Sequence, residues 1–436
     1  MKNFIFSNDR FLLERAREIL IMHVNSRKAR WLIAVVLAGM ASGCENSEPA
    51  PTTTADSYSV RSCMDSTAED SAQINMDDIS VEAIATGLEV PWDLEVLDDG
   101  RILVTERKGT IRLIDPETGL RQEPWATIPV LSKGVVGLMG IALSPQFNES
   151  GYVYVVGTYD AVGKSRVDSL VHRIKKIVIA PFQPDIQFPV RNRVYRLRDE
   201  NGYGRDATIM IDNLPSHEWY GTSSLAFGPD KMIYITTGDA AVPYLAQDDS
   251  SLAGKLLRYR EDGGIPDGNP VSDSPVYAKG FRNSQGLDWD SKDNLFATEH
   301  GPVGYDELNL LVPGGNYGWP NFMGPNAGAK YNDPILTWFA GIAPSGLAVF
   351  DRPGHPWHGD LLIASLKTRQ LRRVATYQDA VGKNRICEEI LLSGTYGRLR
   401  GVHMGSDGHV YLTTSNRDQR GQPEHMDDQI LRLNIP

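Results

Sequence analysis

Four cationic side chains lie in separate strand-like segments of a chain whose formal net charge is −11. A buried cation without a partner is costly, and a guanidinium pairs with a carboxylate through two parallel hydrogen bonds. If these cations converge, they predict a site for a carboxylate-bearing ligand. If they pair with Asp and Glu of neighbouring segments, their role is structural. The four are Arg282, Lys367, Arg398 and Arg400, of which the last two share one strand face.

A second group of polar residues offers oxygen ligands and little nitrogen. Glu299-His-Gly-Pro precedes Asp306 and Glu307, and Asn316-Tyr-Gly-Trp follows them. Such oxygen ligands suit calcium better than zinc. Acidic loops are commonly only solvated, so this pattern alone is a weak indication of a metal site.

The elements that position these residues are short strands. From Val81 onward, apolar runs closed by Gly, Asp-Gly or Asn recur, and several end in Thr or Ser plus a polar residue, as in Met232-Ile-Tyr-Ile-Thr-Thr-Gly-Asp. Intervals of roughly 50 to 70 residues suit four-stranded blades with long loops, and about 350 residues give five to seven blades. The last strand, from Gln429, is expected to close the ring by pairing with an early strand. The sequence therefore predicts an all-β propeller, with a two-sheet sandwich as the alternative.

Composition narrows the function classes. The 436 residues are 41% hydrophobic and 23% charged, which is typical of a globular protein. The acidic balance makes nucleic acid an unlikely partner. Three cysteines are too few for a disulfide framework or a thiolate zinc site.

The N-terminal region predicts export. Arg27, Lys28 and Arg30 precede an apolar run too short to span a bilayer, and small residues then lead into Cys44. The pattern resembles a bacterial lipoprotein signal, with Met22 as an alternative start and a short membrane-anchoring helix as an alternative reading. We expect residues 1–43 to be a signal peptide, residues 44–78 a flexible tether and residues 79–436 the propeller. The protein would then lie in the bacterial cell envelope, in the periplasm, with Cys44 as its lipid anchor.

The sequence leaves open whether the other two cysteines, Cys63 and Cys387, form a disulfide. An oxidising compartment permits a disulfide. Cys63 lies in the tether-like stretch, and spacing does not decide the question.

A series of motifs in order carries a family resemblance from about Val81 to the C-terminus. Together they resemble the soluble pyrroloquinoline-quinone (PQQ)-dependent glucose and aldose sugar dehydrogenases. The motifs are Gly87-Leu-Glu-Val-Pro-Trp-Asp-Leu, Val104-Thr-Glu-Arg, Gly137-Leu-Met-Gly-Ile-Ala, Phe227-Gly-Pro-Asp, Gly280-Phe-Arg-Asn-Ser-Gln-Gly-Leu, Glu299-His-Gly-Pro, Asp306-Glu-Leu-Asn, Asn316-Tyr-Gly-Trp-Pro, Ala343-Pro-Ser-Gly and Gly397-Arg-Leu-Arg-Gly-Val.

The resemblance implies a six-bladed propeller with PQQ and calcium at one end of its channel. It implies oxidation of an aldose or related sugar at C1 to the lactone, with electrons passed to an external acceptor. The cofactor would supply the redox chemistry and the protein the orientation and electrostatics. The residues that match the family's cofactor-binding positions are Arg282, Asn283, Lys367, Arg398 and Arg400.

The metal positions also carry over by resemblance. Gly301 and Pro302 match backbone carbonyls that bind the calcium linked to the cofactor. Glu307 and Tyr317 match part of a second, structural calcium site, but the loop after Pro320 departs from the family pattern.

This sequence departs from the family pattern at the positions that accept the substrate's proton. Counting back five residues from Leu225, the family's general-base histidine corresponds to Tyr220. The preceding residue is Trp219, and Val135 replaces a family glutamine. Neutral imidazole accepts a proton near pH 7, whereas tyrosine has a pKa of about 10. We therefore predict the nearest histidine, His217, as the base, with Tyr220 and loss of catalysis as alternatives.

The sequence allows three alternative functions. The first is a lipid-anchored PQQ- and calcium-dependent sugar dehydrogenase. The second is a non-catalytic propeller that binds a carbohydrate or a protein. The third is a calcium-dependent lactonase-type hydrolase, which would need a carboxylate-rich channel floor. Lys367, Arg398 and Arg400 favour the dehydrogenase over the hydrolase.

Overall fold

The structure is a computed structural model that describes residues 61–63, 74, 78–161, 190–221, 224–378 and 384–436. The expected signal peptide, Cys44 and most of the expected tether lie outside the described residues. Within the described part, no helix is long and apolar enough to cross a membrane.

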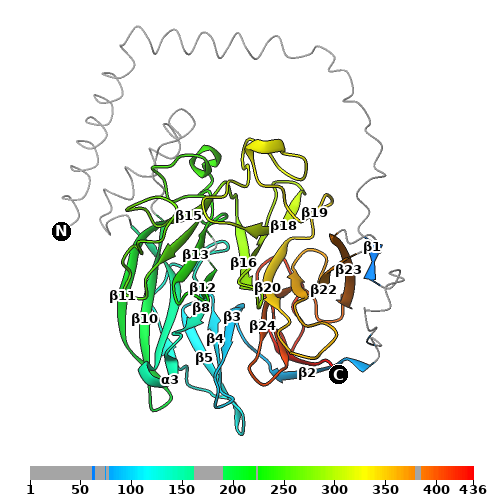
Figure 1. Cartoon of the computed structure of the whole chain (residues 1–436). Helices are drawn as coiled ribbons and strands as arrows, with labels where there is room; N and C mark the ends of the chain where they lie inside the picture. Colours follow the sequence, from blue (N-terminus) through cyan, green and yellow to red (C-terminus); the bar gives the residue numbers. More distant parts are fainter. Residues whose placement is uncertain (1–60, 64–73, 75–77, 162–189, 222–223, 379–383) are drawn as a thin grey trace, which may run out of the picture. The chain divides into compact units, whose positions relative to one another are not determined.

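Six antiparallel sheets form the blades of a β-propeller, so the predicted fold class is confirmed (Figure 1). The first strand of each blade contacts the first strands of the two neighbouring blades, so these six strands surround the central channel. They are β3 (Pro91–Val96), β8 (Leu138–Leu143), β12 (Leu225–Phe227), β16 (Ser284–Trp289), β20 (Pro344–Val349) and β24 (Leu399–Met404).

The remaining strands continue each blade outward by antiparallel pairing. The second strands are β4 (Ile102–Glu106), β9 (Tyr152–Asp160), β13 (Ile233–Thr237), β17 (Leu295–Glu299), β21 (Leu361–Ser365) and β25 (Val410–Thr414). The third strands are β5 (Thr110–Asp115), β10 (Val190–Glu200), β14 (Lys255–Tyr259), β18 (Asp306–Leu311), β22 (Gln370–Gln378) and β26 (Ile430–Asn434). The outer strands are β6 (Gly119–Leu120), β7 (Ala126–Thr127), β11 (Tyr203–Pro215), β15 (Val276–Lys279), β19 (Leu336–Trp338), β23 (Asn384–Ser393) and β2 (Ser80–Ala85). Short helical turns are α3 (Phe147–Ser150), η4 (Pro243–Ala246) and η5 (Gly328–Lys330).

The second strands explain the recurring sequence phrase. In β4, β13, β17, β21 and β25 every residue is buried. These strands are covered on both faces, and their sequences are therefore nearly continuous apolar runs, as is typical of buried strands.

The threonine near the end of these strands connects neighbouring blades. Thr105 Oγ1 donates to the Met139 carbonyl at 2.6 Å, and Thr298 Oγ1 donates to the Ser345 carbonyl at 2.7 Å. Both acceptors belong to the first strand of the next blade. A buried hydroxyl needs such a partner, so the polar residue ends the apolar run at the point where the next blade offers a carbonyl.

The ring is closed by strands from opposite ends of the chain. β2 pairs with β26, with Ser80 opposite Asn434 and Val81 opposite Leu433. The expectation that the C-terminal strand pairs with an early strand is confirmed.

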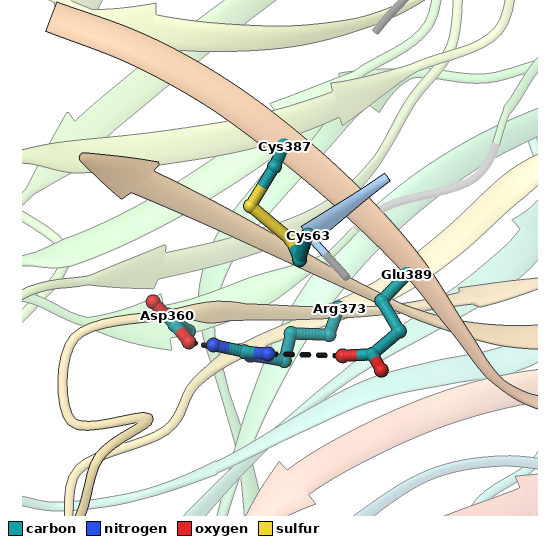
Figure 2. The surroundings of a disulfide bond; sticks show 5 residues. All are labelled: Cys63, Asp360, Arg373, Cys387 and Glu389. Carbon is teal, nitrogen blue, oxygen red and sulfur yellow. Dashed lines mark hydrogen bonds and ion pairs between the residues drawn. A yellow bond between two sulfur atoms is a disulfide. The ribbon is translucent and has the colours of Figure 1, made fainter. Parts of the chain in front are cut away.

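A disulfide joins Cys63 to Cys387 on β23. The short strand β1 (Arg61–Ser62), which lies in the segment expected to be a tether, pairs in parallel with β23. Figure 2 shows the disulfide near Arg373, which forms ion pairs with Asp360 at 2.6 Å and Glu389 at 2.9 Å. The open cysteine question is thus answered by pairing, and residues 61–63 are attached to the outer edge of this blade.

Candidate functional site

A cavity of about 320 Å³ lies where the second strands end and the first strands begin. Because these two strands are antiparallel, the two chain positions meet at one end of the propeller. The lining includes Arg107 after β4, Asn283 before β16, Pro302 after β17, Leu366 after β21 and Arg398 before β24. Six blades therefore contribute loops to one site, which is the size of a small-ligand pocket.

Two of the predicted cations meet on a shared carboxylate. Arg398 Nη2 lies 2.8 Å from Asp418 Oδ2, and Arg400 Nη2 lies 3.2 Å from the same oxygen. Arg400 also lies over the Trp92 ring, with Cζ 4.0 Å from the centroid. The two alternatives from the sequence therefore both hold in part, because these cations face the cavity and also have an acidic neighbour.

Burial sets the electrostatics of this pair. Burial, helped by the neighbouring cations Arg398 and Arg107, lowers the pKa of Arg400 to about 10 despite the attraction of Asp418. Burial is also the largest influence on Asp418 and raises its pKa, but Arg400 and Arg398 outweigh it and hold that pKa below its usual value. Arg400 and Asp418 are thus both charged at neutral pH, and the single Asp418 carboxylate serves two guanidiniums.

Arg282 and Asn283 are held in place by a buried carboxyl at the end of β17. Glu299 Oε1 accepts the backbone N–H of Arg282 at 3.2 Å and that of Asn283 at 2.6 Å. Burial raises the pKa of Glu299 to about 8. The Arg282 side chain donates from Nη1 to the Gly301 carbonyl at 2.9 Å, and its Cζ lies 4.5 Å from the Tyr220 ring centroid.

Gly301 and Pro302 line the cavity from a tight turn. The Gly301 N–H donates to Asp306 Oδ1 at 2.9 Å, while Asp306 Oδ2 accepts the N–H of Ile342 and of Ala343, each at 2.7 Å. A Cβ on Gly301 would lie 1.8 Å from a backbone oxygen of the same turn, so only glycine fits. The turn therefore fixes the backbone of Gly301, whose carbonyl is assigned to calcium by the family resemblance and here accepts the Arg282 hydrogen bond.

Tyr220, and not His217, lies in the cavity lining. The two rings stack with centroids 6.1 Å apart. Nδ1 of His217 accepts the Trp219 N–H at 3.2 Å, so in the neutral ring the nitrogen without hydrogen is already engaged. His217 stays a prediction as the base, and this geometry counts against it.

His300 is the histidine of the cavity wall. Its Nε2 lies 2.6 Å from the Pro344 carbonyl oxygen, and because a carbonyl only accepts, Nε2 carries the hydrogen. Burial lowers the pKa of His300. The ring is thereby oriented against the first strand of the next blade.

The other predicted site residues lie apart from the cavity lining. Lys367 is exposed, and its Nζ donates to the Ala340 carbonyl at 2.9 Å. Both oxygens of Glu307 accept hydrogen bonds, from the Gly324 N–H and the Asn309 amide. The Tyr317 hydroxyl donates to the Leu310 carbonyl at 2.7 Å. Among the described residues, no group of three or more His, Cys, Asp or Glu is arranged to hold a metal ion.

Four charged or aromatic lining residues were missed by sequence reasoning as parts of a site. They are Trp92, Arg107, Asp418 and Arg420. Trp92 and Arg107 lie inside quoted motifs, Pro-Trp-Asp and Thr-Glu-Arg, so a signal existed. Asp418 and Arg420 lie in a polar loop after β25, where the sequence gives no sign that they face a cavity.

Comparison with known proteins places this geometry in a family. A family model for glucose / sorbosone dehydrogenase matches residues 88–422. The chain belongs to the glucose/sorbosone dehydrogenase family. This confirms the resemblance found in the sequence motifs.

Relatives in this family support the same conclusion. A PQQ-bound aldose sugar dehydrogenase structure from Streptomyces coelicolor is 34% identical, covers 84% of this chain and 100% of its own, and has a TM-score of 0.69. An aldose sugar dehydrogenase of Escherichia coli is 28% identical over 77% of this chain and 90% of its own. A quinoprotein glucose dehydrogenase B of Acinetobacter calcoaceticus is 28% identical over 72% of this chain and 68% of its own.

The glucose/sorbosone dehydrogenase cavity of this chain has the chemistry that a quinone carrying several carboxylates requires. Its lining holds five guanidiniums and one carboxylate, and the buried cations Arg398 and Arg400 share that carboxylate. The carbonyl groups of Gly301 and Pro302 suit a hard cation, but a calcium ion there would need its other ligands from the cofactor and from water. The residues present therefore fit PQQ, and they fit calcium only together with it.

Proposed function

We propose that this protein is a PQQ- and calcium-dependent oxidoreductase that oxidises the C1 hydroxyl of an aldose or related sugar to the lactone. The observation that carries the proposal is the convergence of Arg282, Arg398 and Arg400 with the Gly301–Pro302 turn on one cavity. Membership of the family supplies the class of reaction. Electrons would leave to an external acceptor.

In this proposal each residue has a binding or orienting role. Arg398 and Arg400 hold carboxylates of the cofactor, and Lys367 assists from the exposed strand end. Arg282 and Asn283, fixed by Glu299, face the reactive part of the cofactor. When bound, PQQ accepts the two electrons that leave the sugar as its C1–H bond breaks.

In this proposal Tyr220 accepts the proton of the C1 hydroxyl. Its ring is in the cavity wall, under the Arg282 guanidinium, at the position that matches the family base. His217 and His300 are the competing acceptors.

The cellular location remains the one expected from the N-terminal sequence. We propose that the protein is exported and held in the cell envelope by a lipid on Cys44. The disulfide between Cys63 and Cys387 supports an oxidising compartment.

The test is reconstitution of the apoprotein with PQQ and calcium, followed by absorbance of the cofactor on adding aldoses. Reduction of the cofactor by an aldose, and release of the cofactor when a chelator removes calcium, are the expected results. A protein that binds PQQ but never reduces it with any aldose would instead be a binding propeller. A protein that retains PQQ after calcium is removed would contradict the role of Gly301 and Pro302.

A further inference from the structure

The cavity holds more positive charge than its cofactor role uses. Five arginines line it, and Asp418 is the one carboxylate among the lining residues. Within the described part of the chain, Arg107, Arg282 and Arg420 form no ion pair with a carboxylate. Of these three, Arg282 bonds the carbonyls of the Gly301 turn, which leaves Arg107 and Arg420 without an assigned role.

We propose that Arg420, together with Trp219 beside it and Arg107 in the lining of the same cavity, forms a subsite for an anionic group on the sugar, so that the substrate is a uronate or a sugar phosphate and not a neutral aldose. The inference rests on the proposed function. It names the class of sugar that this dehydrogenase oxidises.

Arg420 and Trp219 form the exposed side of the cavity. Both line it, Trp219 is 45% exposed, and Arg420 is exposed, with its Cζ 5.7 Å from the indole ring centroid. The Arg420 backbone N–H donates to Asp418 Oδ1 at 3.0 Å, which fixes the start of this side chain next to the paired arginines. An apolar sugar face can pack on the indole while the guanidinium binds an anionic group through two hydrogen bonds.

Arg107 also lines the cavity, and its side chain is held by a backbone carbonyl. Its Nη1 donates to the Gly134 carbonyl at 3.0 Å, and the neighbouring Val135 N–H donates to the Glu218 carbonyl at 2.8 Å. The Arg107 Nε is buried and has no hydrogen-bond partner among the described residues. Arg107 is half-buried, and its positive charge at the cavity wall favours an approaching anion.

The loop that carries Trp219 contacts the loop of Lys133 and Gly134. Glu218 pairs with Lys133 at 2.6 Å, and a Cβ on Gly134 would lie 2.3 Å from the Glu218 carbonyl oxygen. The backbones of the two loops are therefore in close contact beside the cavity.

The chemistry of the sugar is unchanged by this assignment. The C1–H bond would break with its hydrogen and both electrons passing to the quinone as a hydride equivalent, the hydroxyl O–H proton would go to the base, and C1 would become the lactone carbonyl. The anionic group lies at the other end of the sugar and takes no part in the reaction. It contributes binding energy and specificity.

The test compares glucose, glucuronate and glucose 6-phosphate on the PQQ- and calcium-loaded protein. Calorimetry measures binding of each sugar, and cofactor absorbance measures its oxidation. One charge-assisted hydrogen-bond pair predicts that at least one anionic sugar binds about 10- to 100-fold more tightly than glucose. Its affinity should fall with added salt, because the Arg420 side is open to solvent.

Two variants separate the subsite from general charge effects. Arg420→Gln should remove the preference for the anionic sugar, and Arg420→Lys should restore part of it. The matched control is Arg198→Gln on β10, an exposed arginine whose nearest carboxylate is Glu200 at 3.9 Å, and it should leave the preference unchanged.

The outcomes distinguish the two proposals. A preference for glucuronate alone, or for glucose 6-phosphate alone, supports the subsite and identifies the anion. Equal binding of all three sugars, or a preference that survives Arg420→Gln, overturns it even if glucose is oxidised. Tight, salt-sensitive binding of an anionic sugar without cofactor reduction supports the subsite and overturns the dehydrogenase proposal.

Discussion

At the scale of single residues, the proton acceptor is the main open choice, and Tyr220 can be tested against His217. If Tyr220 takes the proton, Tyr220→Phe should slow cofactor reduction by about 10²- to 10⁴-fold. His217→Ala should be comparatively mild, because its Nδ1 is already engaged by the Trp219 N–H.

The control for this prediction is cofactor binding, which both variants should retain in an absorbance titration. Tyr220→His is informative too, because it restores an imidazole at the cavity wall and should move the activity toward neutral pH. If His217→Ala is the inactive variant, the original prediction from the sequence is right. Equal activity of all variants would point to His300.

The cation pair allows a second prediction at this scale. Arg400→Ala should weaken PQQ binding by about 2 to 4 kcal/mol, because a buried ionic hydrogen bond is lost and the negative charge of Asp418 is less neutralised. Lys367→Ala should cost less, since Lys367 is exposed and bonds Ala340 outside the cavity lining. Titration of cofactor absorbance measures both. Equal losses would place Lys367 on the cofactor.

The residues that the sequence could not predict are informative. Arg282, Arg398 and Arg400 were found because isolated cations in strand-like segments have few uses. Asp418 was not, because a carboxylate in a polar loop looks the same whether it faces solvent or an arginine. Which acids meet which cations depends on loops of different blades, and a single sequence carries no signal for that.

At the scale of elements, the disulfide fixes a segment that its composition indicated as a tether. Cys63 and Cys387 are 324 residues apart, so the bond should stabilise mainly by restricting the unfolded chain, by about 2 to 4 kcal/mol. Cys387→Ser should therefore lower the melting temperature while leaving PQQ titration unchanged, because β23 is the outer strand of its blade. The double variant with Cys63→Ser should equal the single one. A change in PQQ affinity would mean that the outer edge of this blade influences the cavity.

Two carboxyl groups of the first strands allow a prediction on pH. Burial raises the pKa of Asp93 and of Asp288 to about 6. Asp288 Oδ2 accepts the Val349 N–H of the next blade at 2.7 Å, and Asp93 Oδ2 accepts the Ile141 N–H at 3.4 Å. A raised pKa in the folded state means that both groups favour folding below about pH 4 and lose this contribution as pH rises to about 6.

The measurement is melting temperature against pH for the wild type and for Asp93→Asn with Asp288→Asn. The amide oxygen of asparagine can still accept the backbone hydrogen bond but does not titrate. The variant should therefore gain stability relative to the wild type as pH rises from 4 to 7. Parallel curves for the two proteins would show that these carboxyls titrate alike in the folded and unfolded chain.

The elements themselves were largely predictable, and the reason is chemical. Buried second strands appear as apolar runs, and the threonine that ends them appears at a regular place because it bonds the next blade, as Thr105 and Thr298 do. The pairing of β1 with β23 was not predictable, since two residues of strand leave no pattern. The number of blades followed from the family resemblance, because repeat intervals alone allowed five to seven.

At the scale of the whole molecule, the ring depends on one pair of strands from opposite ends of the propeller. β2 supplies the outer strand of the blade that otherwise consists of β24, β25 and β26. Without it, the Ile430–Asn434 strand would expose unpaired N–H and C=O groups at a sheet edge, which promotes aggregation. A chain lacking residues 1–86 should thus melt at a lower temperature than one lacking residues 1–78, or fail to remain soluble.

The shorter truncation is the matched control, because it removes β1 and Cys63 but keeps all of β2, Ser80–Ala85. It should melt like the Cys63→Ser variant, because both lose the disulfide and the two residues of β1 add little to it. The difference between the two truncations then measures the closing strand alone. Since all six blades contribute residues to one cavity, loss of closure should also abolish PQQ binding, whereas loss of the disulfide should not. If both truncated chains bind PQQ equally and melt together, the cavity is maintained by the contacts between first strands, and closure by β2 is dispensable.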